Sequence, residues 1–349
     1  MKKYEMYNRI ADGRNSFSKT DHDATFMRMK DDHMNNGQLK PGYNVQIGTN
    51  NQFVLNYSIH SNPADVRTFI SHVENMVTRG LVLPKIIVAD AGYASEENYE
   101  FCENNGYNAL IPYNTMRIEE KRSFSKNIKY WQNWYYDEVY DRYICPNNKN
   151  VEFKHYSEKI DKYGYIRDFK IYECEDCSDC PHKKNCTKAK GNRQIQYNPI
   201  YEEFKANTRN KLLHNEETIK IYGNRKIEPE TVFGNMKANL LFKKFRLRGN
   251  EKVKIEFGLM AMAHNIQKIS LIRAKNGPNL NKPFNLLKKI NKQKYRGQIF
   301  FFILVEYCPL FVRNYPYGSA PSYIINTLLL IVFLELSVYL FCSYNVYYS

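Results

Sequence analysis

The sequence lacks three features that are typical of secreted or acidic proteins. Its first residues, MKKYEMYNRIADGRN, include lysines but no apolar run, so we expect no signal peptide. Its eight cysteines are unevenly spread, since four fall between Cys174 and Cys186, which argues against a secreted disulfide scaffold. Acidic residues number only 36, against 51 lysines and arginines. We therefore expect a protein of a reducing compartment, the cytoplasm.

The basic excess indicates the kind of partner. The formal net charge is +15 and the isoelectric point is about 9.2. A chain of this charge favours a polyanionic partner, nucleic acid first and an anionic membrane second. Its 349 residues leave room for one large domain or two ordinary ones.

Hydrophobic patterning in the first third predicts an α/β layer with a mixed sheet. Alternating apolar residues over Tyr43–Ile59, with Asn50-Asn51 between the two runs, predict a β-hairpin. A helix follows Asn62-Pro63, with an apolar stripe at the 3.6-residue period. The remaining elements are a strand at Lys85–Ala89, a helix at about Ser95–Asn105 and a strand at Tyr107–Ile111. Residues 1–40 are weakly patterned, and we expect no strand there.

Asp90 ends the buried strand of the stretch PKIIVADAGYASEE. A carboxylate at the carboxyl end of such a strand lies where α/β folds place ligand and metal chemistry. The alternative is that Asp90 only caps the turn that follows, and position alone does not decide between the two.

A cysteine cluster lies within a polar, aromatic and basic region at residues 116–205. Cys174, Cys177, Cys180 and Cys186 have the spacing C-x2-C-x2-C-x5-C, which suits tetrahedral Zn²⁺ bound by four thiolates. Cys145 is a fifth candidate ligand. An iron–sulfur cluster and unliganded thiols are the alternatives, although the last gap departs from ferredoxin spacing. Structural zinc is the favoured interpretation.

The stretch YGNRKIEPETVFGNMK, Tyr222–Lys237, predicts a helix that begins at Pro229. Glu230 and Lys237 lie two turns apart on one side of it, where they can line one site or face solvent without a partner. A basic run containing Arg246 and Arg248 follows. An amphipathic helix then opens at Asn250-Glu251. Its predicted apolar face consists of Ile255, Leu259, Met262, Ile266 and Ile269.

Six stretches together carry a resemblance to a known family. They are SKTDHDATFMRMKDD, PGYNVQIGTN, VADAGYASEEN, the cysteine cluster, RKIEPETVFGNMK and AMAHNIQKI. In these the chain resembles bacterial insertion-sequence transposases of the DDE type, in the subgroup with a cysteine-containing insertion. The resemblance covers roughly residues 15–275 and implies a ribonuclease H-like fold, with a mixed sheet flanked by helices.

The resemblance assigns roles to particular residues. Asp90 matches the second acidic residue of the catalytic triad and Glu230 the third. Tyr222, Arg225 and Lys237 match the basic and tyrosine positions of the family's tyrosine–arginine–glutamate–lysine signature, although the arginine-to-glutamate gap is one residue longer than usual. Two Mg²⁺ or Mn²⁺ ions, held by carboxylates, serve phosphoryl transfer on DNA. Arg246 and Arg248 are expected to bind phosphates. The implied partners are insertion-sequence ends, target DNA and further copies of the chain in a homo-oligomer, at the bacterial nucleoid.

One departure from the family concerns the first catalytic aspartate, which belongs on a strand immediately before the hairpin. No apolar strand bearing an aspartate precedes Tyr43 here; Asp21 and Asp23 belong to a different family stretch, and Asp65 begins a helix. We therefore expect the N-terminal part to be missing, with one metal-binding carboxylate, and the product to be a catalytically defective fragment. The alternative to a DDE transposase is an inactive DNA-binding remnant. Convergence of Asp21, Asp23 or Asp65 on Asp90 and Glu230 would favour the enzyme.

The domain prediction has four parts. Residues 1–115 and 206–275 form the catalytic domain, 116–205 the cysteine- and aromatic-rich insertion, and 276–349 a divergent apolar tail. The tail contains apolar runs at Ile299–Val305 and Tyr323–Phe341. Read-through of a damaged gene end is the favoured origin, with a buried segment and a membrane anchor as alternatives. Glu335 within the second run costs on the order of 3 kcal/mol on insertion scales, which argues against the membrane.

Overall fold

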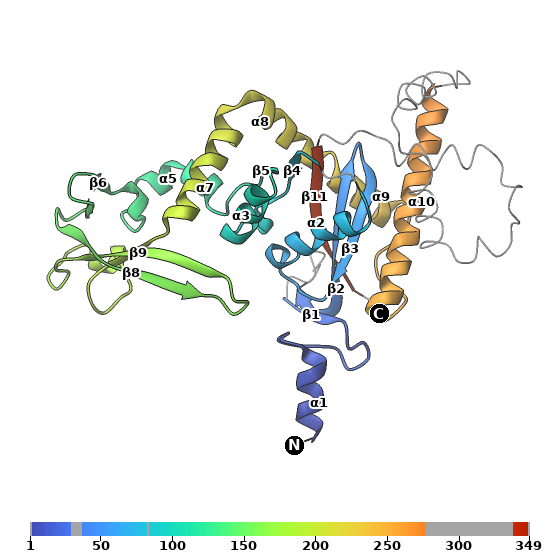
Figure 1. Cartoon of the computed structure of the whole chain (residues 1–349), viewed down its shortest axis with the longest axis horizontal. Coiled ribbons are helices and arrows are strands. Elements are labelled where there is room, and N and C mark those ends of the chain that lie inside the picture. The colour runs from blue at the N-terminus through green and yellow to red at the C-terminus, as the bar shows by residue number, and fades with distance from the viewer. Residues whose placement is uncertain (1, 29–36, 82–83, 277–337, 348–349) are drawn as a thin grey trace, which may run out of the picture. The chain divides into compact units, whose positions relative to one another are not determined.

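The computed structural model describes residues 2–28, 37–81, 84–276 and 338–347 of the protein. The chain divides into two compact units (Figure 1). Unit 1 comprises Met1–Tyr93, Asn105–Ala109 and Lys220–Ser349, and unit 2 comprises Ala94–Asn104 and Leu110–Ile219. The predicted domain boundaries at residues 115, 205 and 275 stay predictions.

Unit 1 is built on a six-stranded mixed sheet, which confirms the expected α/β class. Its strands run in the order β1-β2-β11-β4-β5, and β3 also pairs with β2. The β11–β4 pair is parallel, whereas β2 is antiparallel to β1, β3 and β11. The strands are β1 (Thr25–Arg28), β2 (Leu39–Asn50), β3 (Phe53–His60), β4 (Ile86–Val88), β5 (Asn108–Leu110) and β11 (Val338–Tyr347).

The hairpin prediction is confirmed, with its turn one residue later than expected. Asn51 and Gln52 have φ values of 50° and 62°, so both turn residues adopt the left-handed backbone conformation. Such turns match the right-handed twist of the strands they join, and asparagine tolerates the conformation. The expectation of no strand in residues 1–40 is wrong, because β1 pairs with the first residues of β2. Its four residues are too few to give a period-2 signal.

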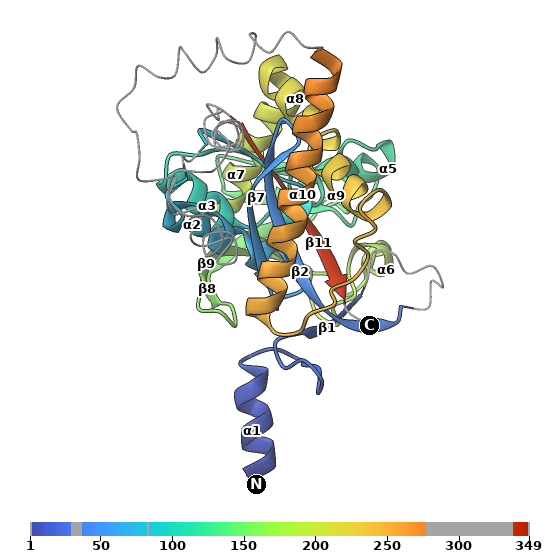
Figure 2. The same cartoon turned by 90° about the vertical axis from the view of Figure 1, so that its right-hand side faces the viewer.

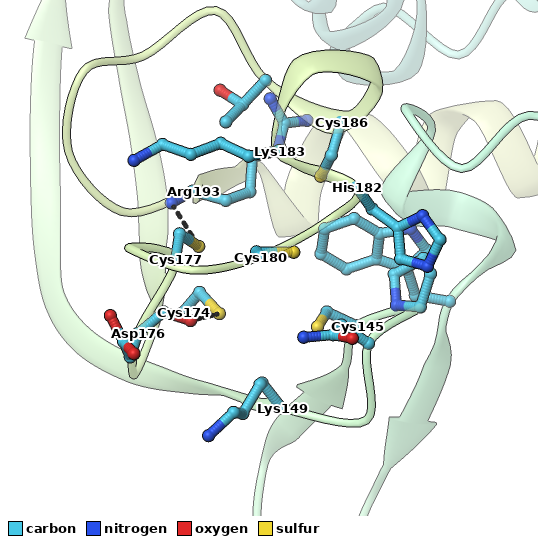
Figure 3. Close-up of a pocket in the computed structure, with 14 residues that line it drawn as sticks. Cys145, Lys149, Cys174, Asp176, Cys177, Cys180, His182, Lys183, Cys186 and Arg193 are labelled. Atoms are coloured by element: carbon cyan, nitrogen blue, oxygen red, sulfur yellow. Dashed lines mark hydrogen bonds between the residues drawn. The ribbon is translucent and has the colours of Figure 1, made fainter.

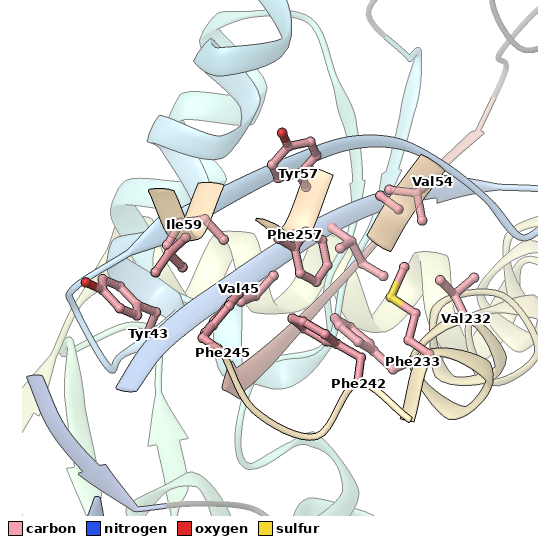
Figure 4. Close-up of a cluster of buried hydrophobic side chains, with 14 of the residues drawn as sticks. Tyr43, Val45, Val54, Tyr57, Ile59, Val232, Phe233, Phe242, Phe245 and Phe257 are labelled. Carbon is pink, nitrogen blue, oxygen red and sulfur yellow. The ribbon is translucent and has the colours of Figure 1, made fainter. Parts of the chain in front are cut away.

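One face of the sheet carries the main hydrophobic core of unit 1 (Figure 4). Residues from β2 and β3 pack there against α9 (Pro229–Ala238) and α10 (Asn250–Asn276). The predicted α9 helix is confirmed, since it begins at Pro229 and buries Val232, Phe233 and Met236. Unit 1 also contains α1 (Lys2–Ala11), α2 (Phe69–Thr78) and the 3-10 turns η1 (Asp65–Arg67), η2 (Ala91–Tyr93) and η5 (Asn224–Lys226).

The α10 helix exists as predicted, but its predicted buried face is wrong at three positions, whereas Ile269 is buried and Met262 half-buried. Ile255, Leu259 and Ile266 are 60%, 52% and 55% exposed, respectively. The buried face instead contains Val253, Phe257, Ala261, His264 and Asn265. Asn265 explains the rotation, because its side chain bonds both the backbone N–H and the carbonyl of Val54 at 2.9 Å. Buried backbone groups require hydrogen-bond partners, and this requirement decides which side of the helix faces the sheet more strongly than the spacing of apolar residues does.

Unit 2 contains an antiparallel five-stranded sheet in the order β10-β9-β8-β7-β6. The strands are β6 (Tyr135–Asp137), β7 (Arg142–Ile144), β8 (Asn150–Ile160), β9 (Ile166–Cys174) and β10 (Gln194–Tyr197). The helices are α3 (Glu96–Asn104), α4 (Met116–Glu119), α5 (Arg122–Ser125), α6 (Lys183–Cys186) and α7 (Pro199–Arg209), and the turns are η3 (Trp131–Asn133) and η4 (Asn210–His214). α8 (Glu216–Gly223) crosses the boundary between the units.

The apolar runs of the tail fall mostly on residues that the structure does not describe. Ile299–Val305 lies outside the described residues, as does Tyr323–Phe341 apart from its last four positions, which begin β11. Among the described helices, none combines the length and apolar character needed to cross a membrane.

Candidate functional site

Asp90 lies two residues beyond the end of β4, as the sequence predicts. Ile87 and Val88 anchor the strand in the core, and η2 follows at once. The backbone N–H of Gly92 donates a 2.8 Å hydrogen bond to Asp90 Oδ1. The carboxylate therefore caps the turn and lies at the carboxyl end of the strand, so the two interpretations of Asp90 are compatible.

Asp65 joins Asp90 at this edge, and it is one of the three acids whose convergence on Asp90 was expected to favour the enzyme. A methyl group built on Gly92 would lie 2.9 Å from Asp90 Oδ1 and 3.3 Å from Asp65 Oδ2. Both carboxylates therefore lie directly over the glycine. We call Asp65 and Asp90 the carboxylate pair. The only local signal for Asp65 was its place at the start of a helical turn, which gave no indication of a partner 25 residues away.

Amide side chains of β2 orient the carboxylate pair. Asn44 Nδ2 donates to Asp65 Oδ1 at 2.8 Å, and Gln46 Nε2 approaches the same oxygen at 3.4 Å. The Tyr93 hydroxyl donates to Gln46 Oε1. Asn44, Gln46 and Tyr93 are buried, so these donors are held in fixed positions. The arrangement presents hard oxygen ligands beside a set of anchored amides.

Asp21 and Asp23 have structural roles. Asp21 is 4% exposed and accepts hydrogen bonds from the Tyr43 hydroxyl at 2.8 Å and the Gly249 N–H at 3.1 Å. Asp23 Oδ2 accepts from the backbone N–H of Asn250 at 2.8 Å, at the first residue of α10. A carboxylate at that position caps the helix and complements its dipole. Neither residue belongs to the carboxylate pair.

Glu230 lies with the predicted signature residues Arg225 and Tyr222. Arg225 Nη1 is 3.6 Å from Glu230 Oε1, and its guanidinium lies 5.7 Å from the centre of the Tyr222 ring. The Glu230 side chain is 54% exposed. Within the described part of the chain, no group of three or more histidine, cysteine, aspartate or glutamate side chains has the geometry to hold a metal ion. Glu230 therefore forms a second cluster, separate from the carboxylate pair.

The predicted phosphate-binding residues follow Glu230 along the chain. Lys237 lies in the last turn of α9, and Arg246 and Arg248 are exposed in the segment before α10. Glu256 fixes this segment, because its carboxylate accepts from the backbone N–H groups of Arg246 and Leu247 at 2.9 Å. An exposed cationic segment with a fixed backbone suits contact with a phosphate backbone.

The four predicted zinc ligands and Cys145 lie around one small cavity in unit 2 (Figure 3). The cavity measures about 20 Å³, and His182 also lines it. Cys145, Cys174, Cys177 and Cys186 are buried, and no disulfide joins the cysteines that the structure describes. Burial raises the pKa of Cys174 to about 12, and it also raises the pKa of Cys186. The sequence thus correctly predicted which thiols lie together.

Two histidines near the carboxylate pair, the half-buried His60 and the buried His72, are neutral near pH 7. Ser58 Oγ lies 2.6 Å from both His60 Nε2 and His72 Nδ1. Burial lowers the pKa of His60 from 6.5 to about 4, although the charge of Asp65 partly opposes the shift. Burial, with the charges of His60 and Arg79, also lowers the pKa of His72 well below 6.5.

These histidines predict acid destabilisation of unit 1. Because the fold disfavours their protonated forms, their contribution to stability is complete above pH 6.5 and is lost as the pH falls toward 4. The His60 shift corresponds to about 3 kcal/mol. Chemical denaturation at pH 7.5 and 4.5 should show a smaller loss of unfolding free energy in His60→Gln than in the natural chain. The exposed His155 is the control, and an equal effect of His155→Gln would contradict the prediction.

The fold and site define a mixed α/β protein with a carboxylate pair at a strand end and an exposed cationic segment before α10. Residues 144–270 match the model of a family described as the transposase DDE domain. Over these residues the chain is similar to a transposase DDE domain, which supports the predicted resemblance there. The match includes Glu230, Lys237 and the cysteine cluster, whereas the carboxylate pair precedes it. No curated protein and no solved structure matches the chain.

Proposed function

We propose that the chain is a DDE-type transposase that carries out phosphoryl transfer at the DNA ends of an insertion sequence. The observation that carries the proposal is the meeting of Asp65 and Asp90 over Gly92, in a chain of which residues 144–270 match a transposase DDE domain. The net charge of +15 suits a DNA partner. Asp90 and Glu230 are the proposed catalytic acids, and Asp65 is a candidate for a third.

The strand order supports a ribonuclease H-like fold for unit 1. The order β3-β2-β11-β4-β5 places a central strand antiparallel to the hairpin and parallel to the strand that leads to Asp90. In such a sheet the carboxyl ends of the parallel strands meet at one edge, where ligand sites form. Asp90 lies at this edge, after β4, and Asp65 of η1 lies beside it.

The residues of the carboxylate pair fit a hard divalent cation such as Mg²⁺ or Mn²⁺. Their oxygens are the preferred ligands, and two protein carboxylates leave coordination places for water and phosphate. When bound, the cation supplies charge neutralisation at the scissile phosphate and an activated oxygen nucleophile. Asn44 and Gln46 hold Asp65 in orientation. Arg225 pairs with Glu230, while Lys237, Arg246 and Arg248 hold the DNA backbone.

A strand-nicking assay with Mg²⁺ or Mn²⁺ on DNA carrying the element's own ends tests the proposal. We expect cleavage by the natural chain and its loss, by at least about a hundredfold, in Asp90→Asn and Glu230→Gln. Asp65→Asn tests whether Asp65 is the third catalytic acid or only a residue that orients Asp90. Cleavage is abolished if Asp65 is a catalytic acid and persists if it only orients Asp90. Asp23→Asn is the control, since Asp23 caps α10. Cleavage that persists in Asp90→Asn would overturn the proposal.

The second candidate function is DNA binding without catalysis. The observation in its favour is that the described residues bring together two carboxylates and leave Glu230 in a separate cluster. In that case the natural chain binds element ends in a gel-shift assay but does not cleave them. Arg246→Ala and Arg248→Ala then weaken binding and its salt dependence, while Asp90→Asn leaves both unchanged.

We also propose a structural Zn²⁺ in the cavity lined by the cysteines. The chemistry of the donors suits zinc, because five thiols and one imidazole line a space of about 20 Å³, enough for one small ion, although these side chains do not lie in ligating geometry. The thiols require deprotonation and a small inward movement to act as ligands. Zinc would connect the end of β9 and helix α6 to Cys145, which follows β7.

A further inference from the structure

The central strand of the unit 1 sheet comes from the far end of the chain. β11 lies between β2 and β4 in the sheet, and Figure 2 shows it alongside β2. Its antiparallel pairing with β2 runs from Leu340 opposite Thr49 to Tyr347 opposite Gly42. Its parallel pairing with β4 runs from Val338 opposite Ile86 to Leu340 opposite Val88. Among the described strands, β11 alone connects the hairpin to β4 and β5.

The pairing makes β11 structurally necessary. Without it, β2 and β4 would each present a row of unpaired backbone donors and acceptors in the middle of the sheet. The sequence of β11, VYLFCSYNVY, is rich in the β-branched and aromatic residues that favour strands. It contains no aspartate or glutamate, so the strand that passes next to β4 brings no acidic residue to that edge.

We propose that the space between β2 and β4 is a strand-binding site, and that its occupant is the C-terminal strand Val338–Tyr347 of the same chain. The strand closes the sheet through backbone pairing on both sides and contributes no carboxylate. Its role is therefore to complete the fold, and the carboxylate pair receives no acidic neighbour from the central strand. This inference concerns the assembly of the sheet and does not depend on the proposed function.

Hydrogen–deuterium exchange on the full natural chain tests the occupant directly. We expect the amides of residues 338–347 to be protected to a degree similar to those of β3, which pairs with the same strand. Protection should be independent of protein concentration. It should be present in samples that light scattering shows to be monomeric. Exchange at the rate of an unstructured peptide, while β3 stays protected, would overturn the proposal. Protection confined to a dimer would also overturn it, because the strand would then come from a second copy.

A substitution in β11 tests its role in holding the sheet together. Leu340 pairs with both Thr49 and Val88, so Leu340→Pro removes a backbone donor and distorts the strand at its doubly paired position. We expect exchange in Ile86–Val88 to become at least about tenfold faster, with the β8–β9 hairpin of unit 2 as internal control. Leu340→Val keeps the donor and should behave like the natural chain. Unchanged protection of β4 in Leu340→Pro contradicts the proposal. If that variant fails to fold, the exchange rates of residues 338–347 in the natural chain decide.

Discussion

A variant with both Cys174 and Cys177 replaced by serine is expected to bind no zinc, whereas the natural chain is expected to bind one ion. Both thiols are buried and line the cavity that also contains Cys145, Cys180 and Cys186. Serine hydroxyls are poor zinc ligands at neutral pH, and the double replacement removes both thiols at and just after the end of β9, leaving the other three thiols and His182 without the ligands that the sheet holds in place. Metal analysis after dialysis measures the stoichiometry.

Zinc binding should release protons and weaken in acid. Burial raises the pKa of Cys174 to about 12, so this thiol is protonated at pH 7 until the metal displaces its proton. Titration with zinc in two buffers of different ionisation enthalpy should reveal the released protons. Because structural zinc contributes on the order of 10 kcal/mol in small modules, the double variant should also lose exchange protection in β9 and α6.

Cys102→Ser is the matched control for the zinc prediction. Cys102 is buried in α3, burial raises its pKa to about 12, and it does not line the cysteine cavity. Replacing it removes a buried thiol without removing a proposed ligand. A natural chain that binds no zinc, or a double variant that keeps its ion, would exclude structural zinc at this place.

Local patterns predicted much of unit 1 and part of the site. The hairpin, the helix from Pro229 and the strand before Asp90 each follow from residues within a single short window. The clustering of the cysteines follows for the same reason, since four of them lie within a few residues of one another. Hydrophobic period, turn residues and ligand spacing are all signals of short range.

Long-range pairing produced the features that sequence reasoning missed or left open. Asp65 meets Asp90 only because η1 and η2 lie together after folding. β11 enters the sheet from the end of the chain, where read-through of a damaged gene end was the favoured interpretation and a buried segment was an alternative. The side of α10 that is buried depends on the hydrogen bond between Asn265 and the backbone of Val54, and the spacing of apolar residues does not predict this bond. Each contact joins segments that are far apart in the sequence, so local patterns do not identify the partner.

Gly92→Ala is expected to weaken cation binding by the carboxylate pair by at least about tenfold while the protein stays folded. The added methyl group would lie 2.9 Å from Asp90 Oδ1, closer than a carbon and an oxygen can approach without movement. It would also crowd Asp65 Oδ2, at 3.3 Å. Alanine keeps the backbone N–H that donates to Asp90, so the substitution displaces the carboxylates without removing that hydrogen bond. Mn²⁺ binding followed by electron paramagnetic resonance measures the change whether or not the chain cleaves DNA.

Gly234→Ala is the control that separates crowding at the site from a general effect of replacing glycine. Gly234 lies inside α9, and a methyl group built on it has no neighbour within 4 Å. Alanine there should leave Mn²⁺ binding unchanged and stabilise the helix by about 1 kcal/mol. If Gly92→Ala binds Mn²⁺ as tightly as Gly234→Ala does, the two carboxylates do not share a cation. A selective loss in Gly92→Ala would instead place the cation at the carboxylate pair, since the methyl group crowds both acids.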